Sequence, residues 1–248
     1  MMTEKTDSRR DFNGHASSGS LRNRFVRLLL GDVIHFFSYH LILRRRTTRV
    51  TRAAGMQFSV RPTVFHPRYF ISSQRFAEFI ATLDLKGKQV IDVGTGAGIL
   101  AIAAARAGAA GVIATDINPS ATLSVPENAR LNGVGGGRVS AVCMDLLSGL
   151  APTPSFDIIV ANLPKHTQAP RDVADRGWTG GPNHRDIIPL FEQAYARLKA
   201  NGQLYVMLSS HSNLSVIENA IRRAGFRFRI AKNFPIFIDA FVLYECSR

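Results

Sequence analysis

Short apolar runs alternate with helical segments along most of the chain after residue 86. The apolar runs are QVIDV, GVIATDI, RVSAVCMD, FDIIVANLP and QLYVMLSS. The segments with helical signals include ILAIAAARAGA, PSATLSVPENARLNG and residues 186–200 and 213–224. Because strands that alternate with helices at this spacing form βαβ units, the pattern predicts a doubly wound α/β domain around a mostly parallel, buried sheet.

Two further patterns flank these units. Residues 226–230 and 237–244 are apolar, alternating stretches joined without a helix, so they predict an antiparallel pair that closes one edge of the sheet. Upstream, residues 47–65 alternate apolar and polar positions around Ala53, Ala54 and Gly55, which predicts a hairpin. Helix signals follow over residues 72–83.

The first 70 residues differ from the rest. Residues 1–20 are polar and rich in Ser and Gly, so we expect disorder. Residues 25–43 are apolar but interrupted, and a spanning helix needs about 20 mostly apolar residues, so no transmembrane segment is expected. The interrupting positions are Arg27, Asp32, His35 and His40. The predicted division is a tail over 1–20, a basic extension with an amphipathic helix and a hairpin over 21–70, and a domain over 71–248.

The charge of the chain favours acidic partners. The net charge is +13, and residues 1–55 hold eleven Arg or Lys against four Asp or Glu. The basic extension is therefore expected to pack on the domain or cap its site, with contact to RNA, another acidic partner or a membrane surface as alternatives. Cys143 and Cys246 form no CxxC or Cys/His cluster, so we expect reduced thiols of a cytoplasmic protein and no metal site.

A glycine-rich turn follows the first strand of the domain. In VIDVGTGAG, the strand carries Asp92 and is followed by Gly94, Thr95, Gly96 and Gly98. Glycines let the backbone turn tightly and approach a ligand across the carboxyl end of the sheet, although a purely structural turn is the alternative. The spacing is GxGxG, because the place of the last glycine in the dinucleotide pattern GxGxxG is taken by an isoleucine. An acidic residue just before the turn suits a ligand with a cationic sulfonium and an amino group better than a pyrophosphate.

Two aspartates end the next two strands. Asp116 lies about twenty residues past the glycines, where a carboxylate accepts both ribose hydroxyls of a nucleoside; a helix N-cap is the alternative. Asp145 is then placed to accept from the adenine amino group, with Ile117 and Leu146 flanking the ring, unless it is a solvated loop residue.

The fourth strand ends in a motif that can position a substrate nitrogen. In ANLPK, Asn162 can accept a hydrogen bond from an NH2 group, and the segment at Pro164 offers a backbone carbonyl. Together they would aim a nitrogen lone pair at an incoming methyl group, which is positioning rather than acid–base catalysis. An Asn-x-Pro turn that ends a strand is the alternative.

These motifs resemble a known family. VIDVGTGAGILAIAAARAGA, ATDINPSA, NARLNGV and FDIIVANLP are similar to the class I methyltransferases, and within them to the "methyltransferase small" group, which includes HemK-type glutamine methyltransferases and, over the cofactor half, ribosomal-protein lysine methyltransferases. The resemblance covers roughly residues 57–245, including TVFHPRYFISS. It implies a seven-stranded sheet with the last strand antiparallel and S-adenosyl-L-methionine bound at the residues named above.

The chain departs from the family at its acceptor motif. Residues 162–165 stand in place of Asn-Pro-Pro-Tyr, so Leu163 replaces the first proline and Lys165 replaces the aromatic that stacks on the methylated group. Candidates for a substitute wall, or for simple packing, are Phe65, Phe70 and Trp178. Trp178 belongs to a polar stretch, residues 167–185, that is long enough for a lid or substrate loop, and His166 directly precedes it.

The resemblance implies methyl transfer to a nitrogen of a protein side chain or of a small molecule. One alternative is a non-catalytic nucleoside-binding module that acts through its basic extension on RNA or a membrane. A nicotinamide-dependent oxidoreductase is disfavoured by Ile99 and by the order of the motifs.

Overall fold

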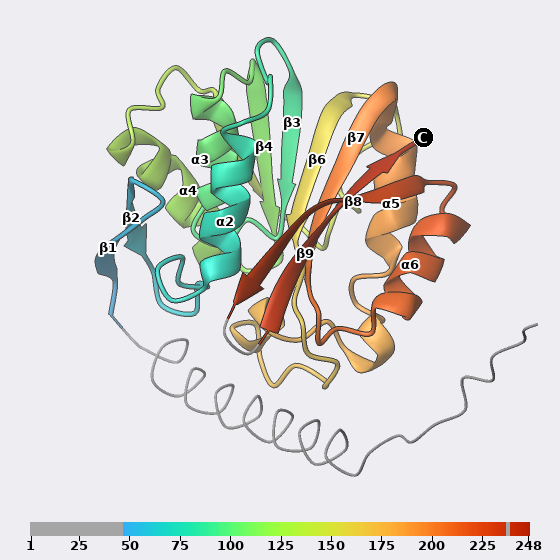
Figure 1. The fold of residues 1–248 in the computed structure, drawn as a ribbon. Coiled ribbons are helices and arrows are strands. Elements are labelled where there is room, and N and C mark those ends of the chain that lie inside the picture. Colours follow the sequence, from blue (N-terminus) through green and yellow to red (C-terminus); the bar gives the residue numbers. More distant parts are fainter. Residues whose placement is uncertain (1–46, 237–238) are drawn as a thin grey trace, which may run out of the picture. The chain divides into compact units, whose positions relative to one another are not determined.

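A computed structural model describes residues 47–236 and 239–248 of the 248-residue chain (Figure 1). The strands are β1 Arg49–Ala53, β2 Met56–Val60, β3 Gln89–Val93, β4 Gly111–Asp116, β5 Val139–Cys143, β6 Phe156–Asn162, β7 Leu198–Ser209, β8 Arg227–Ile236 and β9 Asp239–Ser247. The helices are α2 Ile71–Ile80, α3 Ile99–Arg106, α4 Pro119–Leu131, α5 Pro189–Arg197 and α6 Leu214–Arg223, with short 3-10 turns η2 Asp175–Gly177 and η3 Pro182–His184.

Seven strands form one sheet in the order β5-β4-β3-β6-β7-β9-β8. The pairs from β5 to β7 are parallel, whereas β9 runs antiparallel to both β7 and β8. The predicted fold class, including the antiparallel last strand and the C-terminal pair at the edge, is therefore confirmed. The chain proceeds outward from β3 to β5 and then crosses back to β6 on the other side of β3. Ligands of such sheets bind at this switch point, beyond the carboxyl ends of the strands.

Helices cover both faces of the sheet, with α2, α3 and α4 on one face and α5 and α6 on the other (Figure 1). The central strands are buried on both sides, so neighbouring residues of one strand belong to different cores. Ile158 packs with the first group of helices, and Ile159 packs with the second. This explains why the strand sequences read as continuous apolar runs rather than as alternations.

One helix is shorter than its pattern predicts. We expected a helix over residues 186–200, but α5 begins at Pro189 and ends at Arg197. Proline at the first helical position favours this start because its missing N–H has no partner there anyway. Leu198 has extended backbone angles and pairs with Phe156 of β6, so residues 198–200 belong to β7. The pairing joins residues 42 positions apart, and a local pattern does not contain it.

The predicted hairpin is confirmed as β1–β2. Its turn residues, Ala54 and Gly55, both have positive φ (46° and 70°), as a two-residue type I′ turn requires. The hairpin docks on α4 through two asparagines one helical turn apart. Asn128 bonds both the N–H and the C=O of Ser59, and Asn132 does the same for Gln57. Two side chains thus act as a partner strand for β2.

Replacing Asn128 with alanine is expected to destabilise the fold by about 2–4 kcal/mol, because one buried N–H and two buried C=O groups lose their hydrogen-bond partner. Asn128 is fully buried, and its amide also donates to the Ala97 carbonyl at 2.9 Å. Urea unfolding of the variant measures the loss, with exposed Asn219→Ala as the control. A loss below about 1 kcal/mol would contradict this anchoring role.

The remaining predictions for the N-terminus are partly outside the described residues. The tail over 1–20 and the amphipathic helix expected within residues 25–43 lie entirely outside them. The hairpin packs into the same core as the domain, with Phe58 fully buried, and the boundary at residue 70 stays a prediction. Within residues 47–236 and 239–248, no helix has the length and apolar character needed to cross a membrane.

Candidate active site

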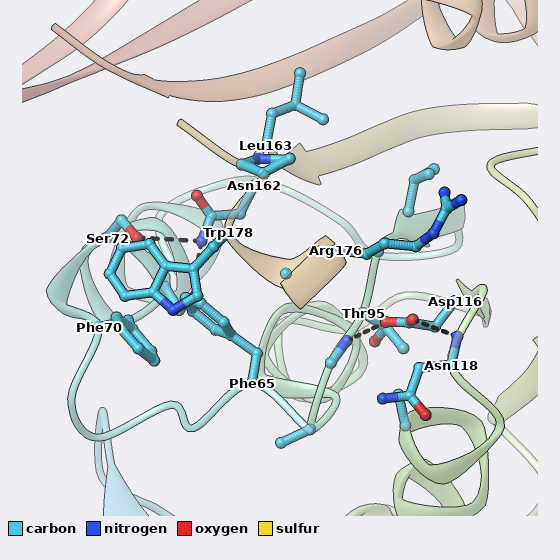
Figure 2. A pocket seen from close by; sticks show the side chains of 18 of the residues that line it. Phe65, Phe70, Ser72, Thr95, Asp116, Asn118, Asn162, Leu163, Arg176 and Trp178 are labelled. Atoms are coloured by element: carbon cyan, nitrogen blue, oxygen red, sulfur yellow. Dashed lines mark hydrogen bonds between the residues drawn. The ribbon is translucent and has the colours of Figure 1, made fainter. Parts of the chain in front are cut away.

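A cavity of about 310 Å³ opens at the switch point, beyond the carboxyl ends of β3, β4 and β6 (Figure 2). The strand order spreads its polar side chains in a row: Asp145 follows β5, Asp116 ends β4, the glycine turn follows β3 and Asn162 ends β6. Most of the predicted site residues line this cavity: Phe65, Gly94, Thr95, Gly96, Asp116, Ile117, Asp145, Leu146, Asn162, Pro164, Lys165 and Trp178.

The glycine turn has the backbone that its sequence predicts. Gly94, Gly96 and Gly98 have φ values of 70°, 54° and 89°, a region that side chains rarely adopt. A Cβ on Gly94 would meet no atom within 4 Å, so a side chain there would project into open space beside the cavity wall. Gly98 instead caps α3 and packs against Val125, away from the lining. Gly94 therefore leaves room for a ligand, Gly96 lets the turn lie against Phe65, and Gly98 serves helix packing.

Asp92 lies beneath the turn rather than on the cavity wall. Its side chain is fully buried, and one oxygen accepts from the Thr95 hydroxyl (2.6 Å) and from the Ala101 N–H (3.0 Å). Oδ1 has no hydrogen bond among the described residues. Burial raises the pKa of this carboxyl to about 7, against the lowering effect of its two donors. Asp92 therefore holds the turn to α3, and a direct contact with a ligand remains a prediction.

The raised pKa predicts a pH-dependent stability. Between pH 4 and pH 7 the folded chain keeps a proton on Asp92 that the unfolded chain releases, so stability falls as pH rises through this window. The loss is on the order of 4 kcal/mol. In Asp92→Asn this dependence disappears, so the variant should gain stability relative to the wild type between pH 5 and pH 8. Urea unfolding at both pH values measures it, and parallel pH profiles would contradict the assignment.

Asp116 is oriented by two backbone donors. Its carboxylate accepts from the N–H of Gly96 (2.8 Å) and the N–H of Asn118 (2.9 Å), one on each oxygen (Figure 2). Burial raises the pKa of this carboxyl, although its backbone donors oppose the effect. The alternative role as helix cap is taken by Asn118, whose side chain accepts from Ser120 N–H. Each Asp116 oxygen keeps lone pairs that can accept from a pair of hydroxyls.

Asp145 and its neighbours form the far end of the cavity. Asp145 is exposed at the end of β5, and the apolar side chains of Ile117 and Leu146 line the cavity beside it. Leu146 has a φ of 50°, which is a rare conformation for a branched side chain. Such strain is found where surrounding structure holds a binding surface in place. This end of the cavity therefore fits a flat ring that lies between Ile117 and Leu146 with its edge toward the Asp145 carboxylate.

Asn162 is held by α2. Its amide nitrogen donates to the hydroxyls of Ser72 (3.2 Å) and Ser73 (2.9 Å), both buried in the first turn of the helix (Figure 2). The amide oxygen, Oδ1, has no hydrogen bond to another described residue, and the side chain lines the cavity. The two serines fix the side chain so that one acceptor atom is left for a ligand.

Three aromatic side chains gather on the opposite side of the cavity from Asp116 (Figure 2). The Phe65 and Phe70 rings stack with centroids 3.7 Å apart, and Trp178 meets both rings edge-on, at 6.0 Å and 4.9 Å. Lys165 lies over the Trp178 ring at 5.4 Å. Distant segments thus bring the three aromatic candidates into one cluster, and their role as a substitute wall for the acceptor stays a prediction.

His166 and the loop that follows it shape this aromatic side. The backbone of His166 bonds to Trp178 and Gly180, and its ring lies 5.5 Å from that of Trp178, but His166 is not among the lining residues. His184 is fully buried, and burial lowers its pKa. The loop thus holds the Trp178 ring in place and is ordered by its own hydrogen bonds.

Several lining residues were not assigned from the sequence, and four of them bear on the argument. They are Thr63, Ser72, Ser73 and Arg176. Thr63 has a φ of 68° and is held by the Asn118 amide through both its carbonyl and its hydroxyl. The only sequence signal was the segment TVFHPRYFISS, which contains three of the four but says nothing of their partners.

Neither cysteine lines the cavity. Cys143 is exposed and Cys246 is buried, and both are free. Burial raises the pKa of the Cys246 thiol to about 12. In the described part of the chain, no group of three His, Cys, Asp or Glu side chains could hold a metal ion.

Comparisons with known proteins place this site in a family. Residues 75–166 match the family described as "Ribosomal protein L11 methyltransferase (PrmA)". A ribosomal protein L11 methyltransferase of Exiguobacterium sp. is 35% identical over 173 residues, which are 69% of this chain and 46% of that protein. A putative protein N5-glutamine methyltransferase of Methanocaldococcus jannaschii is 27% identical over 199 residues, covering 78% of this chain and 96% of the relative.

A solved structure shares the fold. The 16S rRNA N2 G1207 methyltransferase of T. thermophilus, in complex with AdoMet and guanosine, has a TM-score of 0.60 at 22% identity and is matched over 82% of this chain and 50% of its own. The chain also spans about half the length of the L11 methyltransferase that it matches. In sequence the chain is similar to proteins named methyltransferases, and in fold it is similar to a methyltransferase that binds AdoMet.

Proposed function

We propose that this chain transfers a methyl group from S-adenosyl-L-methionine to a nitrogen atom of a polypeptide side chain. The observation that carries the proposal is Asn162, which lines the cavity: two serines hold its amide nitrogen, and its amide oxygen has no hydrogen bond to another described residue. The relatives named for ribosomal protein L11 and for protein N5-glutamine support a protein nitrogen as the acceptor.

The residues of the first half fit the cofactor. Asp116 presents two oxygens to the ribose hydroxyls, Ile117 and Leu146 enclose the adenine ring, and Asp145 accepts from its amino group. Gly94 leaves room for the amino-acid tail. When bound, the cofactor supplies a methyl group on a positively charged sulfur.

The residues of the second half hold the acceptor. Asn162 Oδ1 accepts from the acceptor N–H, and the carbonyl groups of the segment at Pro164 offer a second acceptor, so the nitrogen lone pair points toward the cofactor half. With the cofactor bound, the acceptor nitrogen would take the methyl group as the carbon–sulfur bond breaks, and the surplus proton would pass to bulk solvent when the product leaves. Phe65, Phe70 and Trp178 line the space beside the reacting nitrogen and exclude water from it.

The rim of the cavity favours a polypeptide over a small free molecule. Tyr69, Ile71 and Val173 line the cavity and are 53%, 39% and 37% exposed. Exposed apolar side chains around a pocket are typical of sites that bind another chain. The HemK-like part of the resemblance favours a glutamine amide, whereas Lys165 in place of the aromatic favours a different side chain, so glutamine and lysine are both candidates.

The non-catalytic alternative predicts a site that has lost its acceptor half. Asn162, its two serine partners and the aromatic wall argue for the enzyme instead. An acidic partner for the basic extension stays part of the proposal, since charge is its only support. The reduced thiols favour a cytoplasmic location.

Methyl transfer from labelled S-adenosylmethionine tests the proposal. The purified chain is offered glutamine-containing peptides, lysine-containing peptides and small aromatic amines, and the products are identified by mass spectrometry. We expect label on a peptide nitrogen and none with Asn162→Ala. Labelling of the small amines but of neither peptide would contradict the polypeptide acceptor.

A further inference from the structure

Arg176 is a cation without an assigned role in the cavity wall. It belongs to η2 in the loop after β6, is partly buried and lines the same cavity as Thr95 and Asp116. Its guanidinium makes no ion pair or hydrogen bond with another described residue. Two other arginines of the loop differ, because Arg171 pairs with Asp175 and Arg185 pairs with Asp186.

The loop holds Arg176 on a well-ordered backbone. Asp175 is 1% exposed, and its carboxylate accepts from Arg171 N–H at 3.1 Å. The Asp175 carbonyl accepts from Trp178 N–H and Thr179 N–H. Because these bonds fix the backbone on either side, Arg176 is held in place at the wall of the cavity.

Contacts through Phe65 place this turn beside the glycine loop. A Cβ on Gly96 would lie 3.6 Å from Phe65 Cβ, and a Cβ on Gly177 would also lie 3.6 Å from that atom. Residue 177 is thus separated from the glycine loop by a single side chain. In Figure 2 the Arg176 side chain extends toward the Thr95–Asp116 side and away from Trp178. The guanidinium therefore belongs to the cofactor half of the cavity.

The strand order shows which part of the cofactor lies there. With adenine beside β5 and the ribose at Asp116 of β4, the amino-acid tail must pass over β3 toward Asn162 on β6. The tail ends in an α-carboxylate. Among the described residues, two cations line the cavity, Lys165 and Arg176. Lys165 lies over the Trp178 ring in the aromatic half, which leaves Arg176 as the cation of the cofactor half.

We propose that Arg176 binds the α-carboxylate of the methionyl tail of the cofactor. This inference rests on the proposed function. A planar guanidinium matches a carboxylate with two parallel hydrogen bonds, and such charge-assisted bonds are the strong ones. An unpaired, partly buried cation gains most from an anionic partner because its burial has already removed part of its water.

Calorimetric titration of the full chain with two ligands tests the inference. S-adenosylhomocysteine carries the carboxylate, and its decarboxylated analogue, S-adenosyl-3-thiopropylamine, lacks only that group. Arg176→Gln should weaken binding of S-adenosylhomocysteine by about tenfold to a hundredfold and change binding of the analogue by about twofold or less. Arg176→Lys keeps the charge without the paired donors and should fall between the wild type and Arg176→Gln. Arg68→Gln removes an exposed cation beside the lining residues and should change neither affinity.

The outcomes separate this inference from the proposed function. An unchanged affinity for S-adenosylhomocysteine in Arg176→Gln would overturn the inference, and so would equal losses for both ligands, since equal losses mean a damaged site. In either case binding by the wild-type chain leaves the proposed function standing. If the wild-type chain bound neither ligand, the proposed function itself would fail, and the inference with it.

Discussion

Asp116→Ala is expected to weaken binding of S-adenosylmethionine by about a hundredfold, while the fold is retained. The substitution removes the acceptor of two ribose hydroxyls, and hydrogen bonds to a charged group each contribute about 1.5–3 kcal/mol. Part of the effect comes from the glycine turn, because Gly96 N–H loses its partner on Asp116. Calorimetry with S-adenosylmethionine measures the affinity, and circular dichroism shows whether the variant is folded.

A matched control separates ribose binding from general charge effects. Asp84→Ala removes an exposed carboxylate that also accepts from a nearby backbone N–H, at 3.3 Å from Lys86. It should leave the affinity unchanged. An Asp116→Ala chain that binds S-adenosylmethionine within about threefold of the wild type would remove Asp116 from the ribose site.

Asn162→Ala is expected to lower turnover by about a hundredfold or more and to leave cofactor affinity within a few-fold. The amide oxygen orients the acceptor nitrogen, and misplacing a reacting atom by about 1 Å costs about a hundredfold in rate. Single-turnover rates with labelled S-adenosylmethionine measure the chemical step, once an acceptor peptide is in hand. Equal losses of cofactor affinity and rate would show that Asn162 serves binding instead.

A conservative variant tests the orientation of Asn162. Asn162→Asp keeps an acceptor oxygen for the substrate, and its second oxygen can accept from the hydroxyls of Ser72 and Ser73, which now act as donors. It should recover part of the rate lost in Asn162→Ala. Removing both hydroxyls with Ser72→Ala and Ser73→Ala should lower the turnover of the wild-type asparagine without changing the affinity for S-adenosylhomocysteine.

The sheet was predictable because its signals are local. The central strands β3, β4 and β6 each contain a run of mostly buried apolar residues, and the glycine turn, Asp116 and Asn162 stand at the ends of these runs. The helix predicted over residues 186–200 was too long because pairing between distant residues places residues 198–200 in a strand. Leu198 is in a strand because Phe156 pairs with it, and the helical pattern of its neighbours contains no trace of that contact.

The positions of the residues in the cofactor half could be predicted from the sequence more fully than those in the acceptor half. Gly94, Gly96 and Asp116 lie within one βαβ unit, where spacing predicts position. The contact of Asn162 with Ser73 joins residues 89 positions apart, and the cluster of Phe65 with Trp178 joins two separate loops. In the sequence, Arg176 is one of several charged residues of a polar loop and has no feature that sets it apart. The folded structure shows that it lines the cavity.

The central claim is that the cavity beyond β3, β4 and β6 is a site for S-adenosylmethionine. Calorimetric titration of the purified chain with S-adenosylmethionine, S-adenosylhomocysteine and NAD tests it directly. We expect saturable binding of the first two at one site per chain, loss of that binding in Asp116→Ala, and no binding of NAD. Binding of NAD, or no binding of either sulfur-containing ligand, would contradict the account.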